Sequence, residues 1–385
     1  MNDVPPPPRP PKNMRLRNLV PFIAGASAAT GAPVDKLGDS TLAEPTPPFD
    51  PPTAPLSPAP KLSPSNPPGY QDQKAWKVIQ SHLPLSYQLN ASTLPSEEWW
   101  DWSGHKIHLD RYPNPSAPVK VFLFHGVGTN GRQMSTILGH PLSAHAETVA
   151  TDMPLYGVTR VAPGHIVSYD DWVAAGAAFV DYELARDTRP IVLYGLSAGG
   201  MLAYHVAAAN PKVKGIVGMT FLDQRIREVR DGTALLPAVA QLGYPIAGAA
   251  SSAGLAGLRI PMAAVSKMWA LVNDKPTLKD FFRDTTSAGN SVPLKFLASY
   301  ARYAPKIEPE DFTVCPILLT QPEKDRWTPL EYSELFLDKI DKVRVEKKTL
   351  PGAGHYPIEE EGLRALNRYV QEFVLQVAKE AGTIA

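Results

Sequence analysis

Residues 191–209 of this chain have the sequence IVLYGLSAGGMLAYHVAAA. The tetrad Ile191-Val-Leu-Tyr favours a strand, and the residues from Met201 onward favour a helix. Between them lies Gly195-Leu-Ser-Ala-Gly, a G-x-S-x-G motif that would hold Ser197 on a tight turn from strand to helix. Glycines beside such a turn allow close backbone approach, and a helix N-terminus places positive partial charge near the serine. We therefore predict that Ser197 is a nucleophile.

Apolar strand candidates and helix candidates alternate on both sides of this motif. This order predicts a mostly parallel sheet with helices on both faces. We expect strands at 106–112, 119–124, 147–154, 191–194, 213–221, 314–320 and 343–350, and helices at 73–80, 169–185, 201–209, 329–340 and 358–379. The long segment 224–313 interrupts the alternation, and we predict that it forms a helical cap.

A serine hydroxyl needs a base, and the base needs an acid that orients it. His355 follows the strand 343–350 in a glycine-rich loop, where it would hang over the end of the sheet. Asp325 follows the strand 314–320 and is the favoured acid. Glu323 in the same loop and Asp223 at the end of the preceding strand remain alternatives.

The developing oxyanion needs two backbone N–H donors. Ala198 directly follows the nucleophile and is expected to supply one donor. The loop His125-Gly-Val-Gly-Thr-Asn-Gly follows the strand 119–124, and Val127 is expected to supply the other. This loop has no G-K-[ST] and no G-x-G-x-x-G, so it does not indicate a nucleotide site. His105 and His108 are three apart on a strand and would form a poor metal pair. We expect neither a metal nor a cofactor.

These motifs together resemble the α/β-hydrolase superfamily over residues 100–378. His125-Gly-Val-Gly is similar to its oxyanion loop, and Gly195-Leu-Ser-Ala-Gly to its nucleophile elbow. Asp152-Met-Pro-Leu-Tyr-Gly is similar to its D-x-P-G-x-G turn, with Leu155 where glycine is usual. Within the superfamily the chain looks most like monoacylglycerol-lipase and lysophospholipase-like esterases. The resemblance implies an eight-stranded sheet with a cap inserted between the sixth and seventh strands.

Composition bounds the remaining possibilities. The 38 basic and 38 acidic residues balance, which indicates no nucleic-acid partner. The single cysteine, Cys315, excludes an intramolecular disulfide and lies in an apolar run, so we interpret it as a core residue.

The first 70 residues differ from the rest, because nearly half of the 41 prolines lie in residues 1–68. We expect a disordered tail or linker at 1–70 and the hydrolase domain at 71–385. Within the tail, residues 14–33 resemble a weak export signal or membrane anchor. The protein is therefore expected either in the cytoplasm or exported to the cell envelope, and membrane-surface association is compatible with this segment.

The residues predict a serine hydrolase that cleaves carboxylic esters of hydrophobic or lipid-like substrates. A serine nucleophile argues against dehalogenases and epoxide hydrolases of this fold, which use aspartate. Peptidase, thioesterase, acyltransferase or perhydrolase chemistry on the same triad, and a non-catalytic binding protein, remain alternatives. Twelve apolar cap residues are candidates to line an acyl channel: Leu235, Leu236, Val239, Leu242, Ile246, Leu255, Leu258, Ile260, Met262, Val265, Met268 and Trp269.

Overall fold

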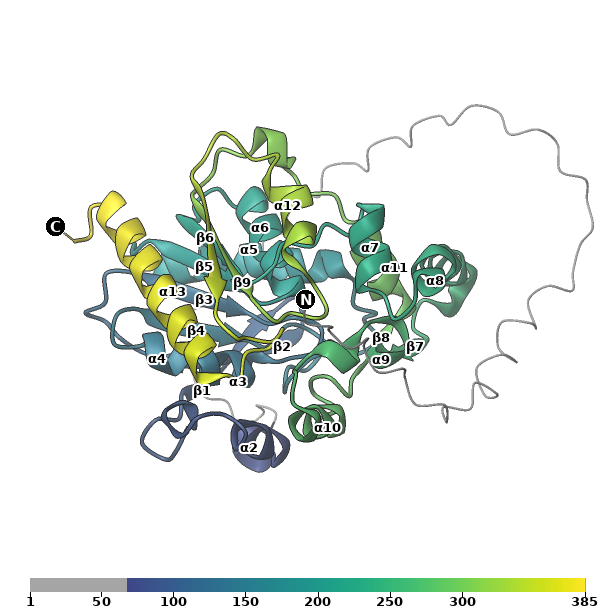
Figure 1. Ribbon diagram of the computed structural model, residues 1–385, viewed down its shortest axis with the longest axis horizontal. Helices are drawn as coiled ribbons and strands as arrows, with labels where there is room; N and C mark the ends of the chain where they lie inside the picture. Colours follow the sequence, from purple (N-terminus) through teal and green to yellow (C-terminus); the bar gives the residue numbers. More distant parts are fainter. Residues whose placement is uncertain (1–67, 385) are drawn as a thin grey trace, which may run out of the picture. The chain divides into compact units, whose positions relative to one another are not determined.

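The computed structural model of the chain describes residues 68–384. Residues 1–67 of the tail predicted at 1–70, including the export-like segment 14–33, lie outside the described residues. An eight-stranded sheet has the order β1-β2-β4-β3-β5-β6-β9-β10 (Figure 1). Its strands are β1 (Ser96–Trp102), β2 (His105–Tyr112), β3 (Lys120–Phe124), β4 (Glu147–Thr151), β5 (Ile191–Gly195), β6 (Gly215–Gly218), β9 (Ile317–Pro322) and β10 (Val345–Leu350).

The sheet is mostly parallel. Strands β1 and β2 pair antiparallel, β2 meets β4 antiparallel, and all pairs from β4 to β10 are parallel. The central strands β3, β4, β5 and β6 are buried along their whole length, as expected for strands covered on both faces. The predicted α/β class is confirmed. The sequence patterns missed β1, because its acidic residues hide the apolar alternation.

Helices cover both faces of this sheet. Figure 1 shows α13 in front of the strands and α5 and α6 behind them. Helices α5 and α6 are packed closely enough that Gly176 leaves no room for a side chain beside Val206. On the other face, Asn367 of α13 donates to the carbonyl oxygen of Ile137. The helices of the main body are α2 (Ala75–Gln80), α3 (Gly131–Met134), α4 (His140–Leu142), α5 (Tyr169–Arg186), α6 (Ala198–Ala209), α12 (Leu330–Leu337) and α13 (Glu360–Glu380).

The long segment between β6 and β9 contains its own small elements. Helix α11 packs against α8 and also against α5 of the main body. Two short strands pair antiparallel within this segment. Its elements are α7 (Arg227–Thr233), α8 (Pro237–Ala250), β7 (Arg259–Pro261), α9 (Met262–Val265), α10 (Lys275–Arg283), β8 (Ser291–Pro293) and α11 (Leu294–Arg302).

A buried lysine interrupts the apolar run of β3. Lys120 is 1% exposed, and its ammonium lies 3.1 Å from Glu183 Oε2 and 2.8 Å from Asp187 Oδ2. Glu183 also forms an ion pair with Arg111, which is another buried cation. Each buried charge therefore has a partner of opposite sign, which a buried charge requires.

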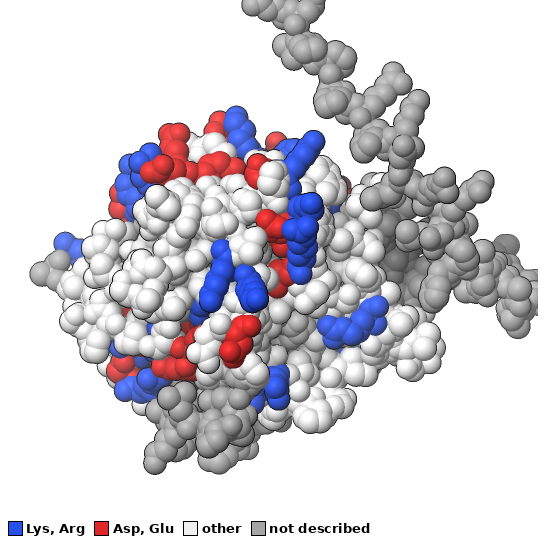
Figure 2. Space-filling view, turned by 90° about the horizontal axis from the view of Figure 1, so that it is seen from below, with Lys and Arg blue, Asp and Glu red and all other residues white. Residues whose placement is uncertain are grey.

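Charges on the surface are mixed. Figure 2 shows basic and acidic residues side by side on one face, with uncharged areas between them. Between residues 68 and 384, none of the helices combines the length and the hydrophobicity that a transmembrane span requires.

Candidate active site

The parallel strands end together, which brings distant parts of the sequence to one edge of the sheet. In the ladder, Phe124 pairs with Gly195, and Gly195 pairs with Gly218. Strand β9 continues the row on the far side of β6, and β10 continues it beyond β9. Ser197 follows β5, while Asp325 and His355 follow β9 and β10. Loops at the carboxyl ends of parallel strands are where α/β proteins build their sites.

Ser197 occupies a strained turn. Its φ is 57° and its ψ is −123°, a conformation that residues other than glycine rarely adopt. The neighbouring glycines are required by close packing: a Cβ on Gly195 would meet the backbone of Gly199. A Cβ on Gly199 would come within 2.5 Å of the carbonyl oxygen of Phe124. The close packing around these glycines holds Ser197 in this strained conformation between β5 and the start of α6.

The imidazole of His355 contacts Asp325. His355 Nδ1 lies 2.8 Å from Asp325 Oδ2, and both side chains are 1% exposed. The two alternative acids are engaged elsewhere: Asp223 pairs with Arg225, and Glu323 accepts a hydrogen bond from the N–H of Gly352. Of the three carboxylates considered from the sequence, the structure brings Asp325 to His355.

The Asp325 carboxylate is held ionised by its surroundings. The N–H groups of Trp327 and Thr328 both donate to Oδ1, at 2.8 and 2.9 Å. The Thr328 hydroxyl donates to Oδ2 at 2.7 Å and lies 3.1 Å from His355 Nδ1. Burial by itself raises the pKa of Asp325, but the neighbouring His355 and these hydrogen bonds lower that pKa below its ordinary value. Thr328 was not among the predicted site residues, although it lies three residues after Asp325 in the same loop.

The second imidazole nitrogen, His355 Nε2, is buried and has no hydrogen-bond partner among the residues described. When Nδ1 donates to Asp325, Nε2 of the neutral ring is an acceptor. Such an atom can take a proton from a hydroxyl, and the hydrogen bonds of catalytic groups are often long before substrate binds.

Trp327 connects His355 to the space in front of Ser197. Its ring centroid lies 4.8 Å from that of the imidazole, and the indole N–H donates to the carbonyl oxygen of Thr233 at 3.0 Å. The same indole lines a cavity with Ser197. The buried Trp327 ring therefore contacts the His355 imidazole and the segment between β6 and β9, and it lines the same cavity as Ser197.

The loop after β3 approaches Ser197 closely. A Cβ on Gly126 would come within 2.8 Å of Ser197 Cβ, so only glycine permits this approach. The N–H of Met153 donates to His125 Nε2, which leaves His125 Nδ1 to donate to the carbonyl oxygen of Gly126 at 2.8 Å. That carbonyl belongs to the peptide whose N–H is Val127, so His125 orients this donor. Burial lowers the pKa of His125, which favours the neutral ring.

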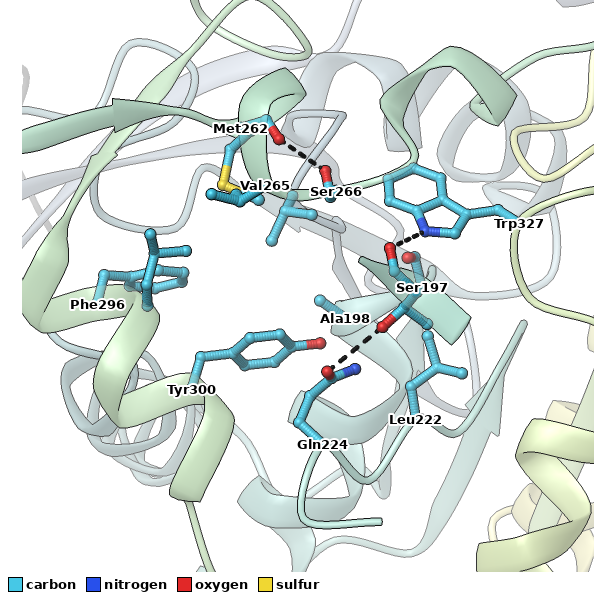
Figure 3. A pocket seen from close by; sticks show the side chains of 13 residues that line it. Ser197, Ala198, Leu222, Gln224, Met262, Val265, Ser266, Phe296, Tyr300 and Trp327 are labelled. Atoms are coloured by element: carbon cyan, nitrogen blue, oxygen red, sulfur yellow. Dashed lines mark hydrogen bonds between the residues drawn. The ribbon is translucent and has the colours of Figure 1, made fainter. Parts of the chain in front are cut away.

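The cavity in front of Ser197 is narrow, with a solvent-accessible volume of about 30 Å³, and it is partly open to solvent. Figure 3 shows Ser197 and Trp327 on one side and Met262, Phe296 and Tyr300 across from them. Its lining residues come from the main body and the cap: Val127, Ser197, Ala198, Leu222, Gln224, Thr233, Met262, Val265, Ser266, Phe296, Leu297, Tyr300 and Trp327.

Two of the apolar cap residues proposed from the sequence, Met262 and Val265, line this cavity. Met268 is instead buried in the core. The side chains of Val239, Leu242 and Ile246 lie outside the described part. Four others are exposed to solvent: Leu236, Leu255, Leu258 and Trp269.

A second cluster of ionisable groups lies away from the cavity. Glu97, His108 and Asp110 come close enough together to hold a metal ion. However, Arg132 donates to Asp110 at 2.6 Å and lies 3.3 Å from Glu97. Burial lowers the pKa of His108, but its contacts with Asp152 and Glu97 raise that pKa to about 9. A protonated imidazole and an arginine already neutralise these carboxylates, so the donor set does not fit a metal ion.

The sheet, the inserted cap and the strained serine turn define an α/β hydrolase. The chain belongs to the alpha/beta hydrolase family, whose model matches residues 121–368. It is 32% identical over 139 residues to the lipase LipV of Mycobacterium tuberculosis, a match that covers 34% of this chain and 49% of that protein. It is also 32% identical over 110 residues to a pimeloyl-[acyl-carrier protein] methyl ester esterase of Xanthomonas oryzae, covering 29% and 38%. The chain thus spans about half or less of these curated relatives.

Solved structures agree on the fold. A soluble variant of monoglyceride lipase from Saccharomyces cerevisiae, in complex with a substrate analog, superposes with a TM-score of 0.60. The match covers 76% of this chain and 98% of that chain at 17% sequence identity. At this identity the likeness concerns the fold alone.

Proposed function

We propose that this protein hydrolyses carboxylic esters through an acyl intermediate on Ser197. The observation that carries the proposal is the contact of His355 with Asp325, beside a cavity that the strained Ser197 lines. The names of the partial relatives, a lipase and a methyl ester esterase, support the same chemistry.

In this mechanism His355 Nε2 accepts the Ser197 hydroxyl proton as the oxygen attacks the ester carbonyl. The buried Asp325 carboxylate stabilises the imidazolium that forms. The backbone N–H groups of Val127 and Ala198 donate to the oxyanion, and the helix N-terminus at Ala198 adds positive partial charge. His355 then protonates the leaving alcohol. Water, deprotonated by the same imidazole, releases the acid.

The cavity lining favours neutral substrates with an apolar part. Its lining includes the apolar side chains of Leu222, Met262, Val265, Phe296 and Leu297, and none of the described residues that line it is Asp, Glu, Lys or Arg. Burying a charged group without a partner of opposite charge is costly. We therefore expect hydrophobic esters to be preferred over esters that carry a charge near the scissile bond.

Ser197→Ala tests the proposal. The wild type should turn over a series of p-nitrophenyl esters of rising chain length, and it should react with a fluorophosphonate probe. The variant should lose both properties, with a loss of turnover on the order of 10³-fold or more. Thermal unfolding of the two proteins serves as the control for folding. Equal turnover by the two proteins would rule out Ser197 as the nucleophile.

A further inference from the structure

One polar side chain stands out in the apolar cavity. Gln224 lies just beyond β6, is 5% exposed, and lines the cavity together with Ser197. Among the described residues, the only hydrogen-bonding contact of its side chain is a long one, in which the Thr233 hydroxyl lies 3.4 Å from Oε1. Thr233 donates its proton at 2.8 Å to the carbonyl oxygen of Val229, so this contact leaves the amide poorly satisfied.

The amide nitrogen of Gln224 has no hydrogen-bond acceptor in the described part of the chain. The amide nitrogen is not fully buried but faces the cavity, so a group from outside the protein or an ordered water can accept its hydrogen bonds. Figure 3 shows the amide beside the open space of the cavity, with the Tyr300 hydroxyl pointing toward it.

The other polar groups of the lining differ from Gln224. The Ser266 hydroxyl donates to the carbonyl oxygen of Met262 at 2.8 Å, so this hydroxyl has no further proton to donate to a ligand. The Trp327 N–H is bonded to Thr233. Gln224 therefore differs from Ser266 and Trp327 in having amide donors that remain available to a ligand in the cavity.

We propose that Gln224 is a specificity-determining residue that hydrogen-bonds a neutral polar group of the substrate, a hydroxyl or a carbonyl oxygen away from the scissile ester. This inference rests on the proposed ester hydrolysis and names its substrate class: apolar esters that carry one uncharged hydrogen-bonding group. A carboxylate at that position is disfavoured, because no cationic side chain is found among the described residues that line the cavity.

The polar group belongs either to the acyl part or to the alcohol part, and paired substrates distinguish the two. Methyl ω-hydroxyhexanoate and methyl heptanoate differ by a hydroxyl in place of a methyl group on the acyl side. Ethylene glycol monohexanoate and propyl hexanoate make the same change on the alcohol side. Monomethyl adipate adds the charged case.

In one of the two pairs, the wild type should have a kcat/KM for the hydroxylated ester at least about 10-fold above that for its methyl counterpart. Gln224→Met keeps the length of the side chain but removes its hydrogen bonding, and it should reduce this ratio to about 1 or below. Ser266→Ala is the matched control and should leave the ratio unchanged. Monomethyl adipate should be the poorest acyl-side substrate.

A binding measurement separates this inference from the proposed function. Calorimetric titration of the Ser197→Ala protein with the same esters should show the same preference, and Gln224→Met in that background should abolish it. If no ester is hydrolysed but this preference is seen, the proposed activity fails and the role of Gln224 stands. If neither pair is discriminated in kinetics or binding, or if Gln224→Met keeps the ratio, the inference is overturned.

Discussion

The side chain of Thr328 contacts both Asp325 and His355, the proposed acid and base. Its hydroxyl donates to Asp325 and lies 3.1 Å from His355 Nδ1. The Thr328 hydroxyl thus orients the Asp325 carboxylate together with the backbone N–H groups of Trp327 and Thr328. Thr328 therefore acts as a positioning residue in the proposed mechanism.

Thr328→Val should lower kcat for p-nitrophenyl esters about 10-fold with little change in KM, because the isosteric side chain fills the same volume without the hydroxyl. Thr328→Ser restores the hydroxyl and should recover most of the activity. Steady-state kinetics of both variants, with thermal unfolding as a folding control, provides the check. Equal losses in the two variants would point to packing of the methyl group instead.

At the scale of elements, Asp152 ties four segments together. This buried carboxylate accepts hydrogen bonds from the N–H of Gly131 at the start of α3, from the N–H of Val158 and from the Tyr70 hydroxyl. His108 of β2 lies 3.0 Å from it. Asp152 follows β4, so one side chain joins the sheet, a helix N-terminus, the following turn and the segment before α2.

Tyr70→Phe should reduce the free energy of unfolding by about 1–2 kcal/mol, because it removes a hydrogen bond to a buried carboxylate. Tyr194→Phe is the matched control: the Tyr194 hydroxyl is buried without a hydrogen-bond partner in the described structure, so its loss should be neutral or stabilising. Urea unfolding followed by far-UV circular dichroism measures both. A destabilisation of similar size in the two variants would contradict the role given to Asp152.

At the scale of the whole molecule, His108 couples stability to pH. It is fully buried between Asp152 and Glu97, and its pKa in the folded protein is raised from the ordinary 6.5 to about 9. Between these two values the folded protein binds one more proton than the unfolded chain. The stabilising contribution is therefore complete below pH 6.5 and is lost as the pH rises through 9.

We expect the free energy of unfolding to fall by up to about 1.4 kcal/mol per pH unit between pH 6.5 and 9. His108→Gln should be less stable overall and should lose most of this slope. His205→Asn is a suitable control, because burial lowers the pKa of His205 to about 3. The effect of His205 on the pH dependence of stability is therefore confined to pH values below about 6.5. Urea titrations at several pH values test this; an unchanged slope in His108→Gln would refute it.

The sequence by itself determined the class of the fold and the candidates for the chemistry. Alternating apolar strands and helices are local patterns, and seven of the eight sheet strands could be predicted from them. The G-x-S-x-G motif and the chain order of Ser197, Asp325 and His355 needed no knowledge of packing. These assignments of site residues remain predictions until Ser197→Ala is measured.

Only the tertiary structure decided which distant residues meet. The contact of His355 with Asp325 depends on how the loops after β9 and β10 pack, and no local pattern separates Asp325 from Glu323. The polar side of the cavity, with Gln224, is equally invisible in the sequence, because its members come from separate segments. Leu155 adopts a φ of +89° where glycine is usual in similar turns, so surrounding contacts hold a conformation that its own residue type disfavours. The pattern of apolar residues that predicts a strand or helix can be read from a short stretch of sequence. Side-chain contacts and burial depend instead on the whole fold.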